Sequence, residues 1–143
     1  MLILLEKIVV YGCLGMLIEV FFTGISSLLR KHWDATAKTY LWMGPIYGLT
    51  ALILEAVSNA ISWPFYLKAF VYLPIIYGAE ALSAWAIKQI IGRVPWDYGV
   101  SHWTPMGFVN FKYIPFWFVL AMAFDPITMF LTKLLRAVSL VAT

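Results

Sequence analysis

Charge is what this sequence has least of. Only 12% of its 143 residues are Asp, Glu, Lys or Arg, whereas 63% are hydrophobic. A soluble domain averages about 25% charged and about 45–50% apolar residues, so an ordinary water-soluble fold is excluded. The mean hydropathy of +0.86 agrees with this. We therefore predict a single integral membrane domain over residues 1–143, with the lipid bilayer as its main surroundings.

Several common chemical signatures are also missing. The single cysteine, Cys13, excludes a disulfide within the chain. The sequence lacks the phosphate loop G-x-x-x-x-G-K-S/T, the zinc motif H-E-x-x-H and the nucleophile motif G-x-S-x-G. The ten Lys and Arg residues lie mostly near the ends of apolar runs, which is typical of membrane flanks rather than of a nucleic-acid surface. We predict no cofactor, no metal and no nucleic-acid partner. The absence of these motifs argues against enzymatic activity but leaves it open.

Long apolar runs are abundant. A spanning helix needs about 20 mainly apolar residues, and four runs meet that length. We predict an all-α polytopic membrane helix bundle of four transmembrane helices, or five if residues 100–111 form a re-entrant or interfacial helix. Prolines within or at the start of these runs predict kinks. The runs are residues 8–29, 40–60, 69–91 and 113–135, and the prolines are Pro45, Pro74, Pro115 and Pro126.

The distribution of basic residues predicts an orientation. Six Lys and Arg lie on the side of the two longer loops and four on the side of the termini. Cytoplasmic loops carry more basic residues, so we expect both loops to be cytoplasmic. This describes a multi-pass protein of the plasma membrane, or of the inner membrane in a bacterium.

Four acidic residues inside the apolar runs are the main functional signal. A charge at the bilayer centre costs at least ~2.5–3.5 kcal/mol, so such side chains face the bundle interior or water. At a rise of ~1.5 Å per residue, Glu19, Glu80 and Asp125 lie about 16 to 18 Å deep, near the midplane, and Glu55 about 8 Å below one face. We expect no basic residue at that depth. Three acids are therefore predicted to meet near the midplane, with a fourth towards the exit.

Small and polar residues follow these acids at helical spacing. The stretch "GPIYG" (44–48) contains two glycines four positions apart, a spacing that lets helices approach closely. The acids either hold helices together through hydrogen bonds, handle protons or cations, or take part in catalysis. The candidate polar interior consists of Glu19, Glu55, Glu80, Asp125, Thr23, Tyr47, Asn59 and Tyr77.

The stretch "GRVPWDYG" (92–99) interrupts the apolar pattern. Gly92 is placed to end the third helix and Pro95 to prevent its continuation, while Trp96 and Tyr98 suit the membrane interface. Asp97 either caps the backbone of the next segment or lies at the mouth of the acidic interior. We treat Trp96, Asp97 and Tyr98 as a candidate entrance loop.

Four stretches in this order resemble a known family. They are "GMLIEVFFTG" (15–24), "LWMGPIYGL" (41–49), "GRVPWDYG" (92–99) and the aromatic "FKYIPFWF" (111–118). Together they resemble the transmembrane protein 229 family and the related bacterial CmpB-like group of type IV ABC-transporter proteins, over about residues 8 to 130. The matching positions are Glu19, Thr23, Gly44, Pro45, Tyr47, Gly48, Glu80, Pro95, Trp96, Asp97 and Tyr98.

The resemblance implies a small multi-spanning membrane protein and carries over no catalytic residue. The serine often found after "WDY" in the family is Gly99 here. Because this chain lacks a phosphate loop, a role as ABC-transporter permease would require a separate nucleotide-binding partner subunit.

The leading hypothesis is a transporter or channel-like protein that handles protons, cations or a small or lipid-like substrate through its intramembrane acids. One copy offers few helices to enclose a pathway, so we expect a homodimer or larger oligomer. One alternative is a membrane-embedded enzyme acting on a lipid or isoprenoid, with Asp97 and the other acids as acid, base or metal ligands. Another is a non-catalytic scaffold or ABC-transporter accessory subunit.

Overall fold

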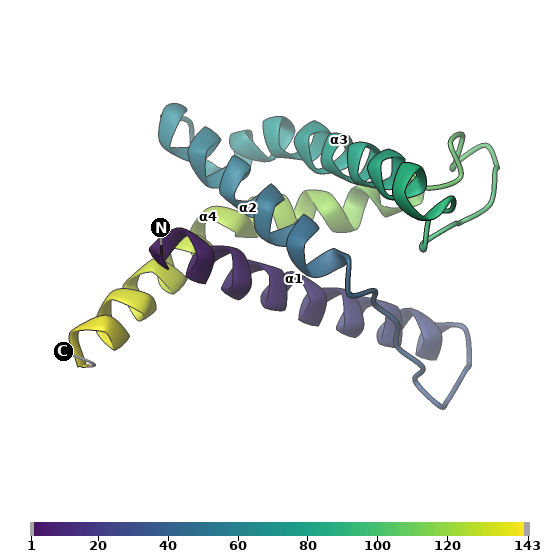
Figure 1. Cartoon of the computed structure of the whole chain (residues 1–143), viewed down its shortest axis with the longest axis horizontal. Helices are drawn as coiled ribbons and strands as arrows, with labels where there is room; N and C mark the ends of the chain where they lie inside the picture. Colours follow the sequence, from purple (N-terminus) through teal and green to yellow (C-terminus); the bar gives the residue numbers. More distant parts are fainter. Residues whose placement is uncertain (1, 142–143) are drawn as a thin grey trace.

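The computed structural model of the chain describes residues 2–141, with side chains placed for residues 4–137. Within these residues it is all-helical and contains no β-strand, only an isolated bridge between Ser101 and Thr104. The prediction of an all-α fold is therefore confirmed. Its elements are α1 (Leu2–Leu29), α2 (Met43–Ala60), α3 (Phe65–Ile91), the 3-10 helix η1 (Phe111–Tyr113) and α4 (Ile114–Val141) (Figure 1).

Three of the four α-helices are long and apolar enough to cross a membrane. These stretches are Leu4–Leu29, Phe65–Ile91 and Phe111–Ala137, and an 18-residue window within each has a mean hydropathy of 2.1, 1.4 and 1.7. The 18 residues of α2 are not among them. A helix of that length rises only about 27 Å, slightly less than the ~30 Å hydrocarbon core. A fourth span over 40–60 therefore stays a prediction.

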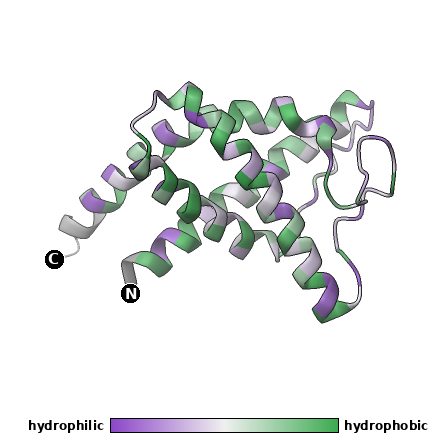
Figure 2. Cartoon of the chain, turned by 90° about the horizontal axis from the view of Figure 1, so that it is seen from above, coloured by the Kyte–Doolittle hydropathy of each residue, from purple (hydrophilic) through white to green (hydrophobic). Residues whose placement is uncertain are grey.

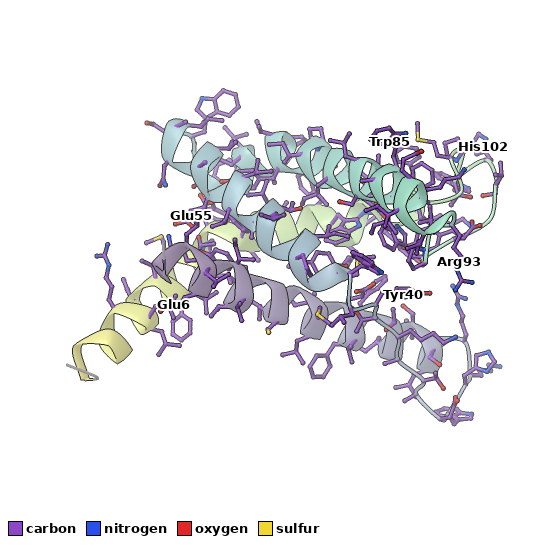
Figure 3. All side chains as sticks on the ribbon, in the orientation of Figure 1. Glu6, Tyr40, Glu55, Trp85, Arg93 and His102 are labelled. Atoms are coloured by element: carbon purple, nitrogen blue, oxygen red, sulfur yellow. The ribbon has the colours of Figure 1, made fainter. Side chains whose placement is uncertain are left out.

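The outer surface of the bundle is apolar. Figure 2 shows hydrophobic residues along all four helices, while the loops at one end mix hydrophilic and hydrophobic residues. Large side chains such as Phe21 and Leu82 are more than half exposed, and Trp85 lies on the outer side of α3 (Figure 3). Water-soluble monomers rarely expose such continuous apolar surface, whereas a lipid-facing bundle requires it.

The third helix ends where the sequence predicts. Gly92 adopts a left-handed φ of 78° and donates its N–H to the carbonyl of Lys88 at 2.9 Å, a conformation that only glycine adopts readily. Pro95 follows. Residues 100–110 then form turns. The N–H of Tyr98, which precedes them, donates to the Gly107 carbonyl at 2.7 Å. The alternative of a fifth membrane helix over 100–111 is therefore wrong, because turn hydrogen bonds replace helical ones there.

The four prolines have different places in the helices. Pro45 and Pro115 lie in the first turns of α2 and α4, where a missing N–H leaves no helical hydrogen bond unmade. Pro74 and Pro126 lie inside α3 and α4. Kinks at these positions stay a prediction.

Glycines bring α1 and α2 into backbone contact. A Cβ atom added to Gly12 would lie 2.5 Å from the Gly44 carbonyl oxygen, and one added to Gly48 would overlap the Ile8 carbonyl oxygen. No side chain fits between the helices at these points. The close approach that the two glycines of "GPIYG" predict is thus present, and α1 packs antiparallel along α2 (Figure 1).

The second helix also joins α1 to the other half of the bundle. One buried cluster packs Leu54 of α2 against Tyr72 of α3 and Ala121 of α4, and another packs Met43 of α2 against Ala84 of α3. By contrast, α1 and α4 have no Cα atoms within 8 Å of each other in the described residues. The second helix therefore packs against each of the other three, whereas the backbones of α1 and α4 lie farther apart.

This packing makes a prediction for paired glycine substitutions. Gly12→Ala adds a methyl group where it would overlap the α2 backbone, and we expect a loss of about 1–3 kcal/mol in the free energy of unfolding. Gly78→Ala is the matched control, because no atom lies within 4 Å of its added Cβ. There alanine should be neutral or stabilise the helix by about 0.5–1 kcal/mol. Unfolding in mixed micelles measures both; equal stabilities for the two variants would contradict the close contact.

Candidate functional site

A cavity of about 370 Å³ lies between the four helices. Its volume falls within the roughly 300–1,000 Å³ of ligand pockets in proteins. Its walls come from α1, α2, α3 and α4, and the 96–98 segment also contributes. The charged residues that line it are Glu19, Lys38, Glu80 and Asp97. Two of the four predicted intramembrane acids therefore reach a common cavity, and two do not.

Glu19 is held by residues from the start of α2. Its Oε2 accepts a hydrogen bond of 2.6 Å from the Thr39 hydroxyl, and its carboxylate also interacts with the Tyr47 hydroxyl. The Tyr47 ring lies directly on Gly15, where an added Cβ would be 2.6 Å from the ring atom Cγ. The glycine contact between α1 and α2 thus places a tyrosine hydroxyl beside Glu19.

Thr39 is a site residue that sequence reasoning missed. It lies in the loop before α2, outside the helical spacing that connects the other polar residues. The predicted Thr23 does line the cavity. Its hydroxyl donates to the Glu19 carbonyl at 2.9 Å and accepts the N–H of Lys38 at 3.0 Å. Thr23 therefore ties the loop before α2 to α1 near Glu19.

Glu80 carries an unsatisfied carboxylate oxygen in the cavity wall. Its Oε2 atom is buried and has no hydrogen-bond partner among the described residues. It interacts electrostatically with Glu19, another acid of the cavity wall. An unpaired buried polar group costs about 1–3 kcal/mol, so native proteins usually satisfy it with a ligand, a proton or water. The cavity thus offers an acceptor that the fold leaves unused.

Trp96 supplies an unmatched donor in the same cavity. Only 4% of this residue is exposed, and its indole Nε1 has no partner in the described part of the chain. The segment after α3 folds back and buries the Trp96 ring against Met43, Ala84 and Ile87, while its position at the membrane interface stays a prediction. Its burial makes it part of the cavity wall.

Asp97 and Tyr98 lie beside Trp96 and also line the cavity. The Asp97 Oδ1 accepts the N–H of Gly99 at 2.8 Å, so Asp97 does cap a turn, and Gly99 has a left-handed φ of 70°. Partial burial, followed by the charge of Glu80, raises the pKa of the Tyr98 hydroxyl, which therefore stays a donor at neutral pH. The segment is thus both a structured turn and part of the cavity wall.

Glu55 is neutralised by a lysine of α1. The Lys7 Nζ lies 2.5 Å from its Oε1, and the Tyr11 hydroxyl donates to its Oε2 at 3.2 Å. Glu55 does not line the cavity. Figure 3 shows it far along α2 from Tyr40, which lies at the other end beside the loops. Glu55 therefore belongs to the contact between α1 and α2.

Asp125 forms a second ion pair at the start of α3. The Lys68 Nζ lies 2.9 Å from its Oδ2, while the hydroxyls of Tyr72 and Ser58 donate to its Oδ1 at 2.7 and 3.0 Å. Lys68 lies twelve positions before Glu80, a rise of about 18 Å along α3. Asp125 is therefore remote from the Glu19–Glu80 end of the cavity.

The expectation that no basic residue reaches the acids is thus wrong for Glu55 and Asp125. The reason is the length of the helices. The first begins at Leu2 rather than at residue 8, and the third at Phe65 rather than at 69. Both additions bring a lysine, Lys7 or Lys68, onto a helix beside an acid.

Two further predicted residues lie outside the cavity wall. Asn59 is exposed near the end of α2, while the neighbouring Ser58 contacts Asp125. The Tyr77 hydroxyl donates to the carbonyl of Asn110 at 3.2 Å and so anchors the loop before η1 to α3. Tyr77 lies on the same helix as Glu80 but does not line the cavity.

An all-helical bundle with three membrane-length apolar helices and a cavity between them defines a small helical membrane protein. The chain belongs to the CmpB family, described as "Putative ABC-transporter type IV", which matches residues 7–142. The resemblance to the CmpB-like group is thereby confirmed, and the family description points to a protein related to membrane transport. No solved structure matches the chain.

The Lys68–Asp125 pair makes a stability prediction. Lys68 is 8% exposed, so Asp125→Asn or Lys68→Met leaves a buried charge without its partner, and each should lower the free energy of unfolding by about 3–5 kcal/mol. The double variant should recover most of that loss, because no unpaired charge remains. Lys133→Met, which removes an exposed lysine of α4, is the control. Unfolding in bicelles gives the coupling energy; purely additive losses would argue against the pair.

Proposed function

We propose that this chain is a membrane component of a transport system that moves a positively charged substrate, small or lipid-like, in exchange for protons. The observation that carries the proposal is the Oε2 atom of Glu80, which is buried without a hydrogen-bond partner in the described chain, on a residue that lines the same cavity as Glu19. Acids in a membrane interior cluster in proton and ion pathways. Glu19 and Glu80 are the proposed substrate and proton site.

The charge of the cavity wall supports a cationic substrate. Three carboxylates and the ammonium of Lys38 line it, so the net charge is −2 when all are ionised. No ion pair neutralises Glu19 or Glu80 in the described residues, in contrast to Glu55 and Asp125. Two carboxylates close together favour binding of either a proton or a cation. Competition between the two is the simplest form of coupled exchange.

The alternatives receive less support. A pure scaffold needs no cavity reaching the acids, yet a cavity of about 370 Å³ does reach them. An enzyme acting on a lipid or isoprenoid could use the carboxylates as acid and base. However, the cavity wall of the described chain holds no Ser, Cys or His that could act as a nucleophile.

We propose four membrane spans, in which α2 also crosses the membrane and is partly shielded from lipid by the other three helices. The membrane is the plasma membrane or a bacterial inner membrane. We further propose a homodimer or larger assembly and a separate nucleotide-binding subunit, because the chain has no phosphate loop and its family is described as transporter-related. We also propose that the chain is related to the transmembrane protein 229 family.

Proteoliposomes test the proton exchange directly. Tetraethylammonium is the probe, because its permanent charge prevents it from crossing the bilayer as a neutral base. We expect its inward gradient to drive proton efflux, reported by a pH-sensitive dye in the lumen. Glu19→Gln and Glu80→Gln should each reduce the initial rate about tenfold or more, since each removes a charge from the site.

Glu6→Gln is the matched control, because Glu6 is an exposed acid of α1 that does not line the cavity. Its rate should equal that of the unmodified protein. Full exchange in both cavity variants, or no exchange above protein-free liposomes with the original protein, would remove the proposed function. Thermal unfolding of each variant shows whether a lost rate reflects lost folding.

A further inference from the structure

We infer that the substrate is a single-chain amphiphile, with an ammonium head bearing a neighbouring oxygen and a hydrocarbon chain that lies between α1 and α4. This inference rests on the proposed function and names the substrate class of the same site. It follows from three features of the cavity: its apolar length, its opening side and the unmatched groups at one end.

The cavity has one polar end and a long apolar remainder. The polar end holds Glu19 and Glu80, with the 96–98 segment beside them. Beyond it the wall continues along α4 from Phe116 to Ile127, a rise of about 17 Å. Leu14 and Ile18 of α1 also line this part. A small hydrated ion cannot use such a wall, whereas a hydrocarbon chain gains roughly 0.8 kcal/mol for each methylene it buries.

The side between α1 and α4 is where a chain could enter from lipid. Both helices line the cavity, yet their backbones do not come within 8 Å of each other in the described residues. Phe22 bridges them near the polar end, with its ring centroid 4.1 Å from that of Phe116 and 5.1 Å from that of Tyr113. The contacts between α1 and α4 are made by side chains, such as Phe22 on Phe116 and Tyr11 on Thr132, and we propose that a ligand enters by displacing them.

The groups at the polar end select an ammonium with an oxygen beside it. The carboxylates favour a cation. Aromatic rings in the wall, including those of Tyr40 and Trp96 with their centroids 6.4 Å apart, favour an organic ammonium through cation–π attraction. The buried Trp96 Nε1 donates to nothing in the described chain, so it calls for an acceptor on the ligand. The net charge of −2 in the wall favours such a cation over a zwitterionic phospholipid.

Photolabelling in nanodiscs tests this inference. The probe is 2-aminohexadecan-1-ol with a diazirine in its chain, added to the full-length protein in phosphatidylcholine nanodiscs, with labelled residues mapped by mass spectrometry. We expect labels on the cavity-facing residues of both α1 and α4. Unlabelled 2-aminohexadecan-1-ol should compete, the short 2-aminoethanol should compete only at far higher concentration, and hexadecan-1-ol and hexadecanoic acid should not compete.

Variants separate recognition of the head from recognition of the chain. Glu80→Gln should weaken probe affinity about tenfold or more, and Trp96→Phe about fivefold, the sizes expected for a charge-assisted and a neutral hydrogen bond. Leu120→Trp should block the apolar slot and reduce labelling. Val119→Trp is its matched control, because Val119 is 61% exposed and does not line the cavity.

Each outcome decides the inference. Labels confined to other surfaces, equal competition by hexadecan-1-ol, or loss of labelling when phosphatidylethanolamine is added would overturn it. Proton exchange with tetraethylammonium that depends on Glu80, together with equal competition by 2-aminoethanol and 2-aminohexadecan-1-ol, would overturn the inference but leave the proposed function standing. Loss of both that exchange and specific labelling would remove the two together.

Discussion

The contact on which the rest of the structure depends is the backbone approach of α1 to α2. Gly12 and Gly48 leave no room for a side chain against Gly44 and Ile8 of the facing helix. Because lipid tails are as apolar as the helices, close packing of this kind is a main driving force for association in a membrane. The approach puts the Tyr47 ring onto Gly15 and its hydroxyl beside Glu19. A packing constraint thereby sets the geometry of the polar site.

The four acids predicted inside the membrane divide into two kinds. Glu55 and Asp125 meet Lys7 and Lys68 and join one helix to the next, so their charges are compensated inside the fold. Glu19 and Glu80 line a cavity without such a partner in the described chain. Since a pair removes the cost of a charge in lipid, only uncompensated acids offer binding energy to an incoming cation. The difference separates structural residues from candidate transport residues.

Much of the fold was predictable from the sequence because it follows from composition and spacing. Apolar runs fixed the all-helical class, Gly92 the end of α3, and "GPIYG" the close helix contact. The site was only partly predictable. Counting depth along each span separately grouped Asp125 with Glu19 and Glu80. Such a count contains no information on how far each helix extends, or on which lysine of a neighbouring helix pairs with the acid. Thr39 and the buried Trp96 depend on how loops fold back, and no periodic signal encodes that.

The central claim is that, of the four acids predicted inside the membrane, Glu19 and Glu80 have no ion-pair partner in the described chain, whereas Glu55 and Asp125 do. Reaction of the protein in lipid bilayers with a hydrophobic carbodiimide tests it most directly, because the reagent modifies accessible carboxyl groups that are not held in ion pairs. Peptide mass spectrometry should find modification at Glu80 and Glu19, with Glu55 and Asp125 left intact by their lysines. Modification of Glu55 or Asp125 ahead of the two cavity acids would contradict the account.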